Sequence, residues 1–401
     1  MQNPVFDRIG LSLIVEISER IREVAPRWQD EHGEPFAFLQ RGELANDTPP
    51  VVTRALERAV AAGLTRYPKA GGEPWFREAV LARLGVRGLA GGLGPEHVMC
   101  TCGAQEGLEL IFNLFAGGRV VLFEPVWACV PDNIAAYSNC RLDPVPLVER
   151  EGRLDIDFAQ VEAKLPGAAL LYLNSPHNPS GKVFTREELA RLNDMCLRHG
   201  VRIVSDEAYE DFLFGGARHT SMLEFPGDHI FAVFTCSKTF AATGFRIGYF
   251  VCRDAALVAK LTIGEYAQTG GVATFIQKAM ADAMLDPDAL YGWLRPVVAA
   301  FERRRDLIAA RLRPVLGDDL FVPGGSFYYF LNLNGHVPEA PDGLAQEEFV
   351  LRRFLDAGVA VIPGPAFGVS GYRNHVRLSF SGIEEDALGR ALERITGKVL
   401  S

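Results

Sequence analysis

The sequence has no long apolar run and no excess of basic residues. No segment of the 401 residues approaches the roughly 20 consecutive apolar residues that cross a membrane. The formal net charge of −9 argues against nucleic acid or an anionic membrane as the main partner. These absences predict a cytoplasmic protein in which any anion-binding site is a local feature. The first residues also lack the apolar core of a signal peptide, since they include the charged Asp7, Arg8, Glu16, Glu19 and Arg20.

Cysteine is scarce and shows no pairing pattern. The seven cysteines are an odd number in a long chain, which argues against a disulfide framework. No second Cys or His pair lies at metal-ligand spacing from Cys100 and Cys102, so these two indicate strand packing and no metal site. The glycine cluster from Gly88 to Gly94 precedes a strand, which makes it a turn and not a phosphate-binding loop.

Between His97 and Cys252 the sequence alternates short apolar runs with longer amphipathic runs. The expected strands are Val98–Thr101, Val120–Phe123, Ala169–Leu173, Val201–Ser205, Ile230–Thr235 and Ile247–Val251. Helical patterns such as Glu106–Phe115 and Arg186–Arg198 lie between most of them. Continuous apolar strands that alternate with helices predict an α/β fold with a mostly parallel sheet covered on both faces.

The two ends of the chain have a different pattern. Ser12–Ala25 has helical periodicity, and Pro26 is expected to end that helix. Residues 320–401 mix strands, such as Phe327–Leu333, with helices, such as Gln346–Ala357. The C-terminal part is therefore expected to be α+β and distinct from the middle of the chain.

Two cations stand out in the apolar stretch from Phe234 to Tyr249. Lys238 follows a predicted buried strand, and Arg246 lies between two apolar residues. A buried cation without a partner costs several kcal/mol, so each needs an anion or a covalent partner. Surface side chains that extend to water would explain either residue alone. A lysine that forms a Schiff base beside an arginine that binds phosphate would explain both, as a pyridoxal phosphate site requires.

Polar residues follow the predicted strands, where open α/β sheets bind their ligands. Asp206 ends a strand, and its attraction to a pyridinium nitrogen would be on the order of 4 kcal/mol at an effective dielectric of about 20. Tyr209 and Asn178 can donate to a phenolate oxygen, and Trp127 can stack on a ring. The helix that begins at Gly103 offers free N–H groups to a phosphate. The alternatives are an Asp206 that caps the next turn, a Trp127 that packs in the core or at an interface, and an ordinary helix start at Gly103.

Arg377 belongs to an alternating strand near the C-terminus. Val376 and Leu378 share one face of that strand, so Arg377 points to the other. An arginine fork suits a substrate carboxylate through two parallel hydrogen bonds. A salt bridge at the surface or at an interface is the alternative.

These motifs together resemble the fold-type I pyridoxal phosphate enzymes, specifically the class I/II aminotransferases of the aspartate aminotransferase superfamily. Residues 237–249 are similar to the Schiff-base signature of that family, residues 174–181 to its Asn-Pro motif and residues 206–209 to its Asp-Glu-x-Tyr motif. Residues 363–368 and 376–380 are similar to its C-terminal pattern. The resemblance covers nearly the whole chain, and its first and last motifs are highly specific.

The resemblance implies a fold and an assembly. A mostly parallel seven-stranded sheet would form a three-layer large domain, residues 51–289. Both chain ends, residues 1–50 and 290–401, would form a smaller α+β domain. A homodimer with active sites at the subunit interface is also implied, in which Tyr67, five residues before Gly72, reaches the phosphate in the neighbouring subunit.

The resemblance also implies roles for individual residues. Lys238 would form the internal aldimine and move the α-proton, and Asp206 would pair with the pyridine nitrogen. Asn178 and Tyr209 would contact the phenolate oxygen, and Trp127 would stack on the ring. The substrate would contact Arg377 through its α-carboxylate, with Asn178 and the backbone of Gly42 nearby. Residues implied to hold the phosphate are Gly103, Ala104, Gln105, Thr235, Ser237 and Arg246.

The expected function is transfer of an amino group between an amino acid and a 2-oxo acid through the Lys238 Schiff base. Elimination, replacement, cyclisation or oxidation in specialised metabolism is the alternative, because the same cofactor chemistry serves these reactions. A regulatory module is disfavoured because Lys238, Asp206 and Arg377 are all present.

The departures from the family pattern surround the substrate side of the expected pocket, so the sequence leaves the substrate open. They are Leu44 after Gly-Glu, Lys69 and Gly71 beside Tyr67, and Gly107. No arginine lies between Arg253 and Arg295, which argues against an acidic substrate held there by the partner subunit.

Overall fold

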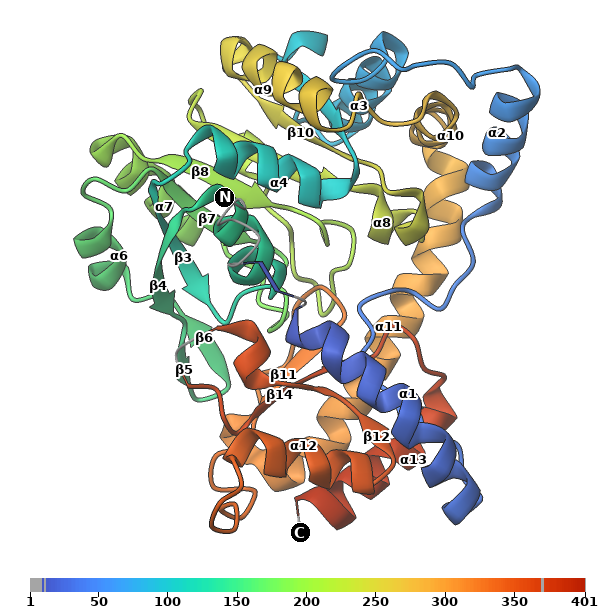
Figure 1. The fold of residues 1–401 in the computed structure, drawn as a ribbon, viewed down its shortest axis with the longest axis vertical. Coiled ribbons are helices and arrows are strands. Elements are labelled where there is room, and N and C mark those ends of the chain that lie inside the picture. Colours follow the sequence, from blue (N-terminus) through green and yellow to red (C-terminus); the bar gives the residue numbers. More distant parts are fainter. Residues whose placement is uncertain (1–8, 11, 369–370, 401) are drawn as a thin grey trace, which may run out of the picture.

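A seven-stranded sheet forms the centre of the larger part of the molecule (Figure 1). The computed structural model describes residues 9–10, 12–368 and 371–400. Only β10 runs antiparallel to its neighbours, and every other pair in this sheet is parallel, which confirms the predicted mostly parallel sheet. In spatial order its strands are β2 (Val98–Thr101), β10 (Gly248–Cys252), β9 (Ile230–Thr235), β8 (Arg202–Asp206), β7 (Leu170–Asn174), β3 (Arg119–Glu124) and β4 (Arg141–Pro146).

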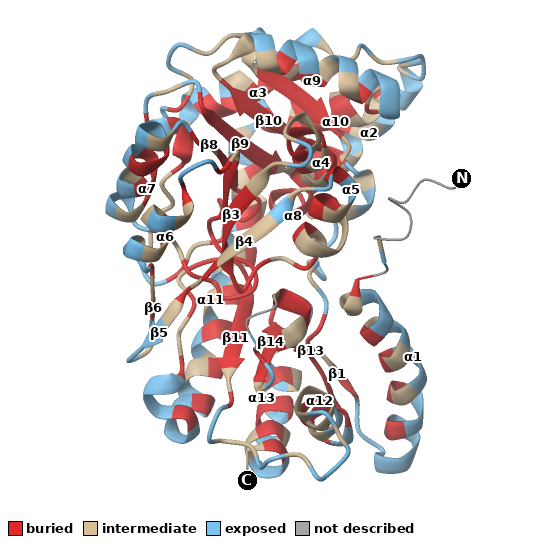
Figure 2. Cartoon of the chain, turned by 60° about the vertical axis from the view of Figure 1, so that its left-hand side comes forward, coloured by how far each residue is buried: buried red, intermediate tan, exposed pale blue. Residues whose placement is uncertain are grey.

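Helices cover both faces of this sheet. Successive side chains of a strand point to opposite faces, so Val233 packs with one helix layer while Ala232 and Phe234 pack with the other. In Figure 2 the strands are buried and the outer sides of the helices are exposed. One layer contains α4 (Gly103–Leu114), α5 (Ala136–Ser138) and α9 (Ala255–Gln268), and the other α2 (Pro50–Ala61), α3 (Pro74–Val86), α6 (Phe158–Lys164), α7 (Arg186–His199) and α10 (Thr274–Met284).

The two ends of the chain build the smaller part together, as expected. β1 (Ala37–Phe38) pairs in parallel with β12 (Val359–Ala360). In Figure 1 the blue α1 (Leu13–His32) lies beside the orange and red C-terminal elements, and it packs on α12 (Gln346–Asp356). The remaining elements here are a small sheet of β11 (Tyr328–Asn332), β14 (His375–Ser379) and β13 (Ile362–Pro363), with α13 (Glu385–Arg394).

The 30-residue helix α11 (Pro287–Leu316) connects the two parts. Leu290 belongs to the core beside the large sheet, whereas Phe301 and Ile308 belong to the core of the smaller part. A short hairpin, β5 (Val148–Arg150) and β6 (Arg153–Asp155), lies outside the large sheet and contacts the smaller part, where Asn332 Nδ2 donates to Glu149 Oε2 at 2.7 Å. Among the described residues, no helix has the length and apolar character required to cross a membrane.

The predicted end of the first helix at Pro26 is wrong. The helix continues to His32 and ends at Gly33, which has φ +67°. Proline removes one backbone N–H, but packing of the next turn offsets that loss. Trp28 is 6% exposed, and its indole Nε1–H donates to the Asp356 carbonyl at 3.0 Å.

Strand β4 was not among the strands whose residue ranges were predicted from the sequence. It contains Asp143, Pro144 and Pro146, and its pattern is not apolar. It lies at the edge of the sheet and pairs only with β3, which tolerates prolines because one side of the strand needs no ladder hydrogen bonds.

Candidate active site

A cavity of about 600 Å³ lies at the carboxyl ends of β7, β8 and β9, and β14 and the segment after β1 line its other side. Ligands of open α/β sheets bind at this edge. Most of the site residues predicted from the sequence come together here. They are Gly42, Ala104, Gln105, Trp127, Asn178, Asp206, Tyr209, Thr235, Ser237, Lys238, Arg246 and Arg377.

Two predicted residues do not line the cavity. Gly103 lies directly behind its wall, where a Cβ would be 3.0 Å from Nη2 of Arg246. Tyr67 is fully exposed on the loop between α2 and α3. Within its own chain Tyr67 therefore contributes nothing to the cavity.

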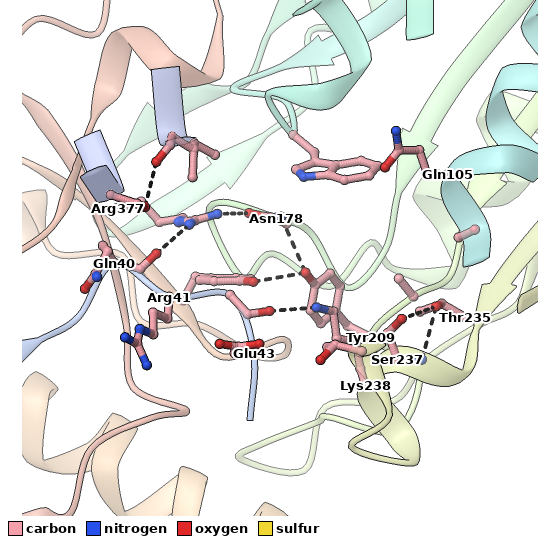
Figure 3. Close-up of a pocket in the computed structure, with 18 of the residues that line it drawn as sticks. Gln40, Arg41, Glu43, Gln105, Asn178, Tyr209, Thr235, Ser237, Lys238 and Arg377 are labelled. Atoms are coloured by element: carbon pink, nitrogen blue, oxygen red, sulfur yellow. Dashed lines mark hydrogen bonds between the residues drawn. The ribbon is translucent and has the colours of Figure 1, made fainter. Parts of the chain in front are cut away.

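Lys238 enters the cavity from α8 (Cys236–Thr239), the single turn that follows β9. Its Nζ donates to the Gly42 carbonyl at 2.6 Å, and no carboxylate within the described ranges forms an ion pair with it (Figure 3). Residue 42 is a glycine that passes close to Tyr328. A Cβ on it would lie 2.7 Å from the Tyr328 hydroxyl, so a larger residue would clash there. Burial, and to a smaller extent the charge of Arg377, lower the pKa of Lys238 to about 8. Lys238 is thus an amine that loses its proton far more easily than an ordinary lysine.

Asp206 lies at the end of β8 and is 4% exposed. Its Oδ1 accepts from the Ala208 N–H at 3.1 Å, and its Oδ2 accepts from the Tyr172 hydroxyl at 3.0 Å. Burial raises the pKa of Asp206 to about 6, against the lowering effect of these two hydrogen bonds. In the part of the chain that the structure describes, no lysine or arginine forms an ion pair with it. A buried carboxylate that has no cationic partner favours binding of a ligand with a cationic N–H donor in the cavity.

At another side of the cavity, Arg246 faces the first turn of α4. The guanidinium lies against Gly103, whose φ of +75° starts that helix, and its Nη1 donates to the Thr243 carbonyl at 3.1 Å. Thr235 Oγ1 accepts from the Ser237 N–H at 3.1 Å, and its hydroxyl donates to Ser237 Oγ at 3.0 Å. This arrangement suits an anion. It combines two hydroxyls, a helix N-terminus and an arginine that has no acidic partner among the described residues.

Arg377 lies on β14 and is 3% exposed. Its Nη1 donates to Asn178 Oδ1 at 3.1 Å and its Nη2 to the Gln40 carbonyl at 3.0 Å (Figure 3). The guanidinium carbon lies 4.5 Å from the centre of the Tyr328 ring, and burial lowers the pKa of Arg377. These partners are neutral, so the buried cation remains available to an anionic ligand.

Two tyrosines of this site, Tyr328 and Tyr172, were not among the residues predicted from the sequence. Tyr328 lines the cavity, and its hydroxyl is 3.1 Å from that of Tyr209, to which Asn178 Nδ2 donates at 3.4 Å. Tyr172 holds Asp206 from the neighbouring strand. Both lie in apolar runs that predict only buried strands. The signal for Tyr172 was its place two residues before Asn174, on the same face of β7.

Comparisons with known proteins agree with this geometry. The family model described as aminotransferase class I and II matches residues 37–395. A probable aspartate/prephenate aminotransferase of Thermus aquaticus is 34% identical over 368 residues, 90% of this chain and 91% of that protein. The corresponding probable aspartate/prephenate aminotransferase of Aquifex aeolicus is 32% identical over 363 residues, 88% of each chain. A solved structure of a double mutant of Thermus thermophilus aspartate aminotransferase has a TM-score of 0.87, with 29% identity and 98% of each chain covered.

The donor set of the cavity fits pyridoxal 5′-phosphate, the cofactor of this family. The cofactor has three groups that need partners. Its phosphate needs an anion-binding site, its ring nitrogen needs a carboxylate, and its aldehyde needs a reactive amine. The cavity supplies Arg246 without an acidic partner among the described residues, Asp206 without a cationic one and Lys238 with a lowered pKa. With the family model matching most of its length, the chain belongs to the class I and II aminotransferases and is a pyridoxal-phosphate-dependent transferase.

Proposed function

We propose that this aminotransferase moves an amino group between an amino acid and a 2-oxo acid, with Lys238 as the residue that attaches the cofactor. The observation that carries the proposal is the position of Lys238 Nζ, 2.6 Å from the Gly42 carbonyl in a cavity that also contains Asp206 and Arg377. An amine with a pKa of about 8 reacts with an aldehyde near neutral pH, where an ordinary lysine is almost entirely protonated.

The proposal assigns the remaining residues of the cavity to three parts of the ligand. Asp206 pairs with the ring nitrogen, Trp127 stacks on the ring, and Asn178 and Tyr209 donate to its phenolate oxygen. When bound, the cofactor supplies a ring that accepts electrons from the substrate Cα. Residues assigned to the phosphate are Gly103, Ala104, Gln105, Thr235, Ser237 and Arg246.

Arg377 takes the α-carboxylate of the substrate in this proposal, with Asn178 and Gly42 beside it. A guanidinium has five N–H donors, and Asn178 and Gln40 use two of them. The α-carboxylate can therefore bind without displacing either protein partner. This places the substrate Cα toward Lys238, which accepts the α-proton at Nζ and holds it beside the Gly42 carbonyl. Such a proton shuttle contributes about 10²- to 10⁴-fold to the rate.

The division into residues 51–289 and residues 1–50 with 290–401 is also part of the proposal. Separate hydrophobic cores support it, although α11 crosses the boundary at residues 289 and 290. A cytoplasmic location is proposed as well, supported by seven cysteines that are all unpaired.

We further propose a homodimer in which Tyr67 reaches the phosphate site of the second copy. Tyr67 is fully exposed, and Ile263 and Tyr266 of α9 are each 70% exposed. The loop of Tyr67 packs against α9, since Glu265 Oε2 accepts from the Gly71 N–H at 2.5 Å. Exposed apolar side chains therefore occur on both of these adjoining elements, and exposed apolar surface of this kind marks protein interfaces.

Ile263→Glu combined with Tyr266→Glu is expected to convert the protein to monomers and to weaken cofactor binding, because each phosphate site loses Tyr67 of the other copy. Sedimentation velocity and titration of the apo chain with the cofactor measure both effects. Leu197→Glu on α7, at a site 49% exposed, is the matched control and should change neither. A double variant that stays dimeric, or a monomer that keeps full cofactor affinity, contradicts the shared site.

The rate at which the apo chain reacts with pyridoxal phosphate should depend on the protonation of Lys238. Only the neutral amine attacks the aldehyde, so below a pKa of about 8 the rate should rise about tenfold per pH unit and then level off. Stopped-flow absorbance between about pH 6 and 10 measures this, with the Lys238→Ala chain as the blank. A rate that keeps rising to about pH 10 would mean an ordinary lysine.

A screen of amino acids against the holoenzyme tests the proposed reaction. Transamination converts the bound cofactor to its pyridoxamine form with one equivalent of 2-oxo acid, which the visible spectrum and product analysis record together. Ammonia or a cyclic product, formed without the pyridoxamine form, would assign the chain to elimination, replacement, cyclisation or oxidation instead.

A further inference from the structure

The hydroxyl of Tyr172 contacts the carboxylate of Asp206 from the neighbouring strand. It donates to Asp206 Oδ2 at 3.0 Å, and the tyrosine is only 1% exposed. Tyr172 does not line the cavity, so it can act on a ligand only through Asp206.

The strand register fixes this contact. β7 and β8 are parallel, with Asn174 opposite Asp206 and Tyr172 opposite Val204. Asn174 Nδ2 donates to the Asp206 carbonyl at 2.8 Å, so one residue of β7 holds the backbone of Asp206 and another holds its side chain. The ring of Phe112, from α4, meets the Tyr172 ring edge-on at 6.2 Å between centres. Packing therefore fixes the phenol with its hydroxyl toward Asp206.

Electrostatics decides the direction of the hydrogen bond. Burial and the nearby Asp206 carboxylate raise the pKa of Tyr172 well above its usual value, so the phenol stays protonated and donates. Burial raises the pKa of Asp206 to about 6, and the bond from Tyr172 is one of two that oppose this rise. The other comes from the Ala208 N–H, to Oδ1. Without Tyr172 the buried carboxylate would keep a single donor, the Ala208 N–H, among the described residues.

We propose that Tyr172 is a positioning residue that keeps Asp206 ionised and orients its carboxylate toward the ring nitrogen of the cofactor. This inference rests on the proposed role of Asp206. It predicts that Tyr172 influences only ligands that have a ring nitrogen. The hydroxyl should matter for pyridoxal phosphate and should be neutral for an otherwise identical ligand with CH in place of that nitrogen.

The test compares the binding of two ligands by the apo form of Tyr172→Phe, which removes one oxygen atom. The variant should bind pyridoxal phosphate about 10-fold more weakly or worse, as expected for a lost hydrogen bond to a charged group. Its affinity for 1-deazapyridoxal phosphate should stay within about twofold of the unmodified chain. In an Asp206→Asn background, Tyr172→Phe should have no further effect on either ligand, since its target carboxylate is gone.

A matched control distinguishes this effect from loss of any buried hydroxyl. Tyr329 is also fully buried, and its hydroxyl donates to the Arg305 carbonyl at 2.8 Å in the smaller part of the molecule. Tyr329→Phe should leave the affinities for both ligands unchanged. If Tyr172→Phe does not fold, Phe112→Leu can replace it, because it removes the ring that packs against Tyr172. It should also weaken the binding of pyridoxal phosphate more than that of 1-deazapyridoxal phosphate, by a smaller factor than Tyr172→Phe.

The outcomes separate this inference from the proposed function. Equal weakening of both ligands by Tyr172→Phe would show a packing role and overturn the inference, and unchanged affinities for both would also overturn it. If Asp206→Asn itself fails to distinguish the two ligands, the proposed role of Asp206 is wrong. If Asp206→Asn distinguishes them and Tyr172→Phe does not, only the inference about Tyr172 fails.

Discussion

Lys238→Ala is expected to abolish covalent attachment of pyridoxal phosphate and to reduce transamination by at least about 10⁴-fold, the upper end of what one acid–base group contributes. In the proposed function, the variant loses both the amine that attaches the cofactor and the base that moves the α-proton. The cofactor can still bind without a covalent bond, because the residues proposed to hold its phosphate and ring are unchanged. Borohydride reduction followed by mass spectrometry detects attachment, and single-turnover absorbance measures the transfer.

Lys164→Ala is the matched control for this experiment. Lys164 forms an ion pair with Asp143 at 2.7 Å near the edge of the large sheet and does not line the cavity. The Lys164→Ala variant should retain both the borohydride-trapped cofactor and the transamination activity. If Lys238→Ala keeps a borohydride-stable cofactor together with transamination, the central assignment of the site is wrong.

Arg377→Met should lower kcat/KM for α-amino acids by about 10²- to 10⁴-fold, because in the proposed function the substrate carboxylate loses two charge-assisted hydrogen bonds of about 1.5–3 kcal/mol each. Arg377→Lys keeps the positive charge but lacks the planar guanidinium. Its kcat/KM should therefore lie between those of Arg377→Met and the unmodified chain. Steady-state kinetics with a good amino donor gives these ratios. Affinity for the cofactor should change little, because none of the proposed cofactor contacts comes from Arg377.

A substrate without a carboxylate supplies the control for Arg377. A simple amine that reacts slowly with the unmodified chain should lose less than about tenfold in Arg377→Met, since it has no group for the guanidinium to bind. Arg377 also lowers the pKa of Lys238, so its removal should shift the pH profile of the reaction to higher pH. Equal losses for the amine and the amino acid would place the α-carboxylate elsewhere.

Local sequence patterns predicted most of the larger part of this protein. Apolar runs separated by amphipathic helices give a parallel sheet because such strands must be covered on both faces. The edge strand β4 escaped this pattern because Asp143, Pro144 and Pro146 are tolerated where one side of the strand is unpaired. The first helix extends beyond Pro26 for a tertiary reason, since the buried Trp28 stabilises the turn that follows the proline.

The family and the candidate site residues follow from local sequence, because the motifs around Lys238, Asp206 and Arg377 each carry their chemistry in adjacent residues. Which of these groups touch depends on the folding of the whole chain. Lys238 meets the Gly42 carbonyl across 196 positions of sequence, and Arg377 meets Asn178 across 199. No local pattern encodes such contacts, because they depend on how the chain ends fold back over the sheet. The bond from Tyr172 to Asp206 is of the same kind, since it follows from the register of two neighbouring strands.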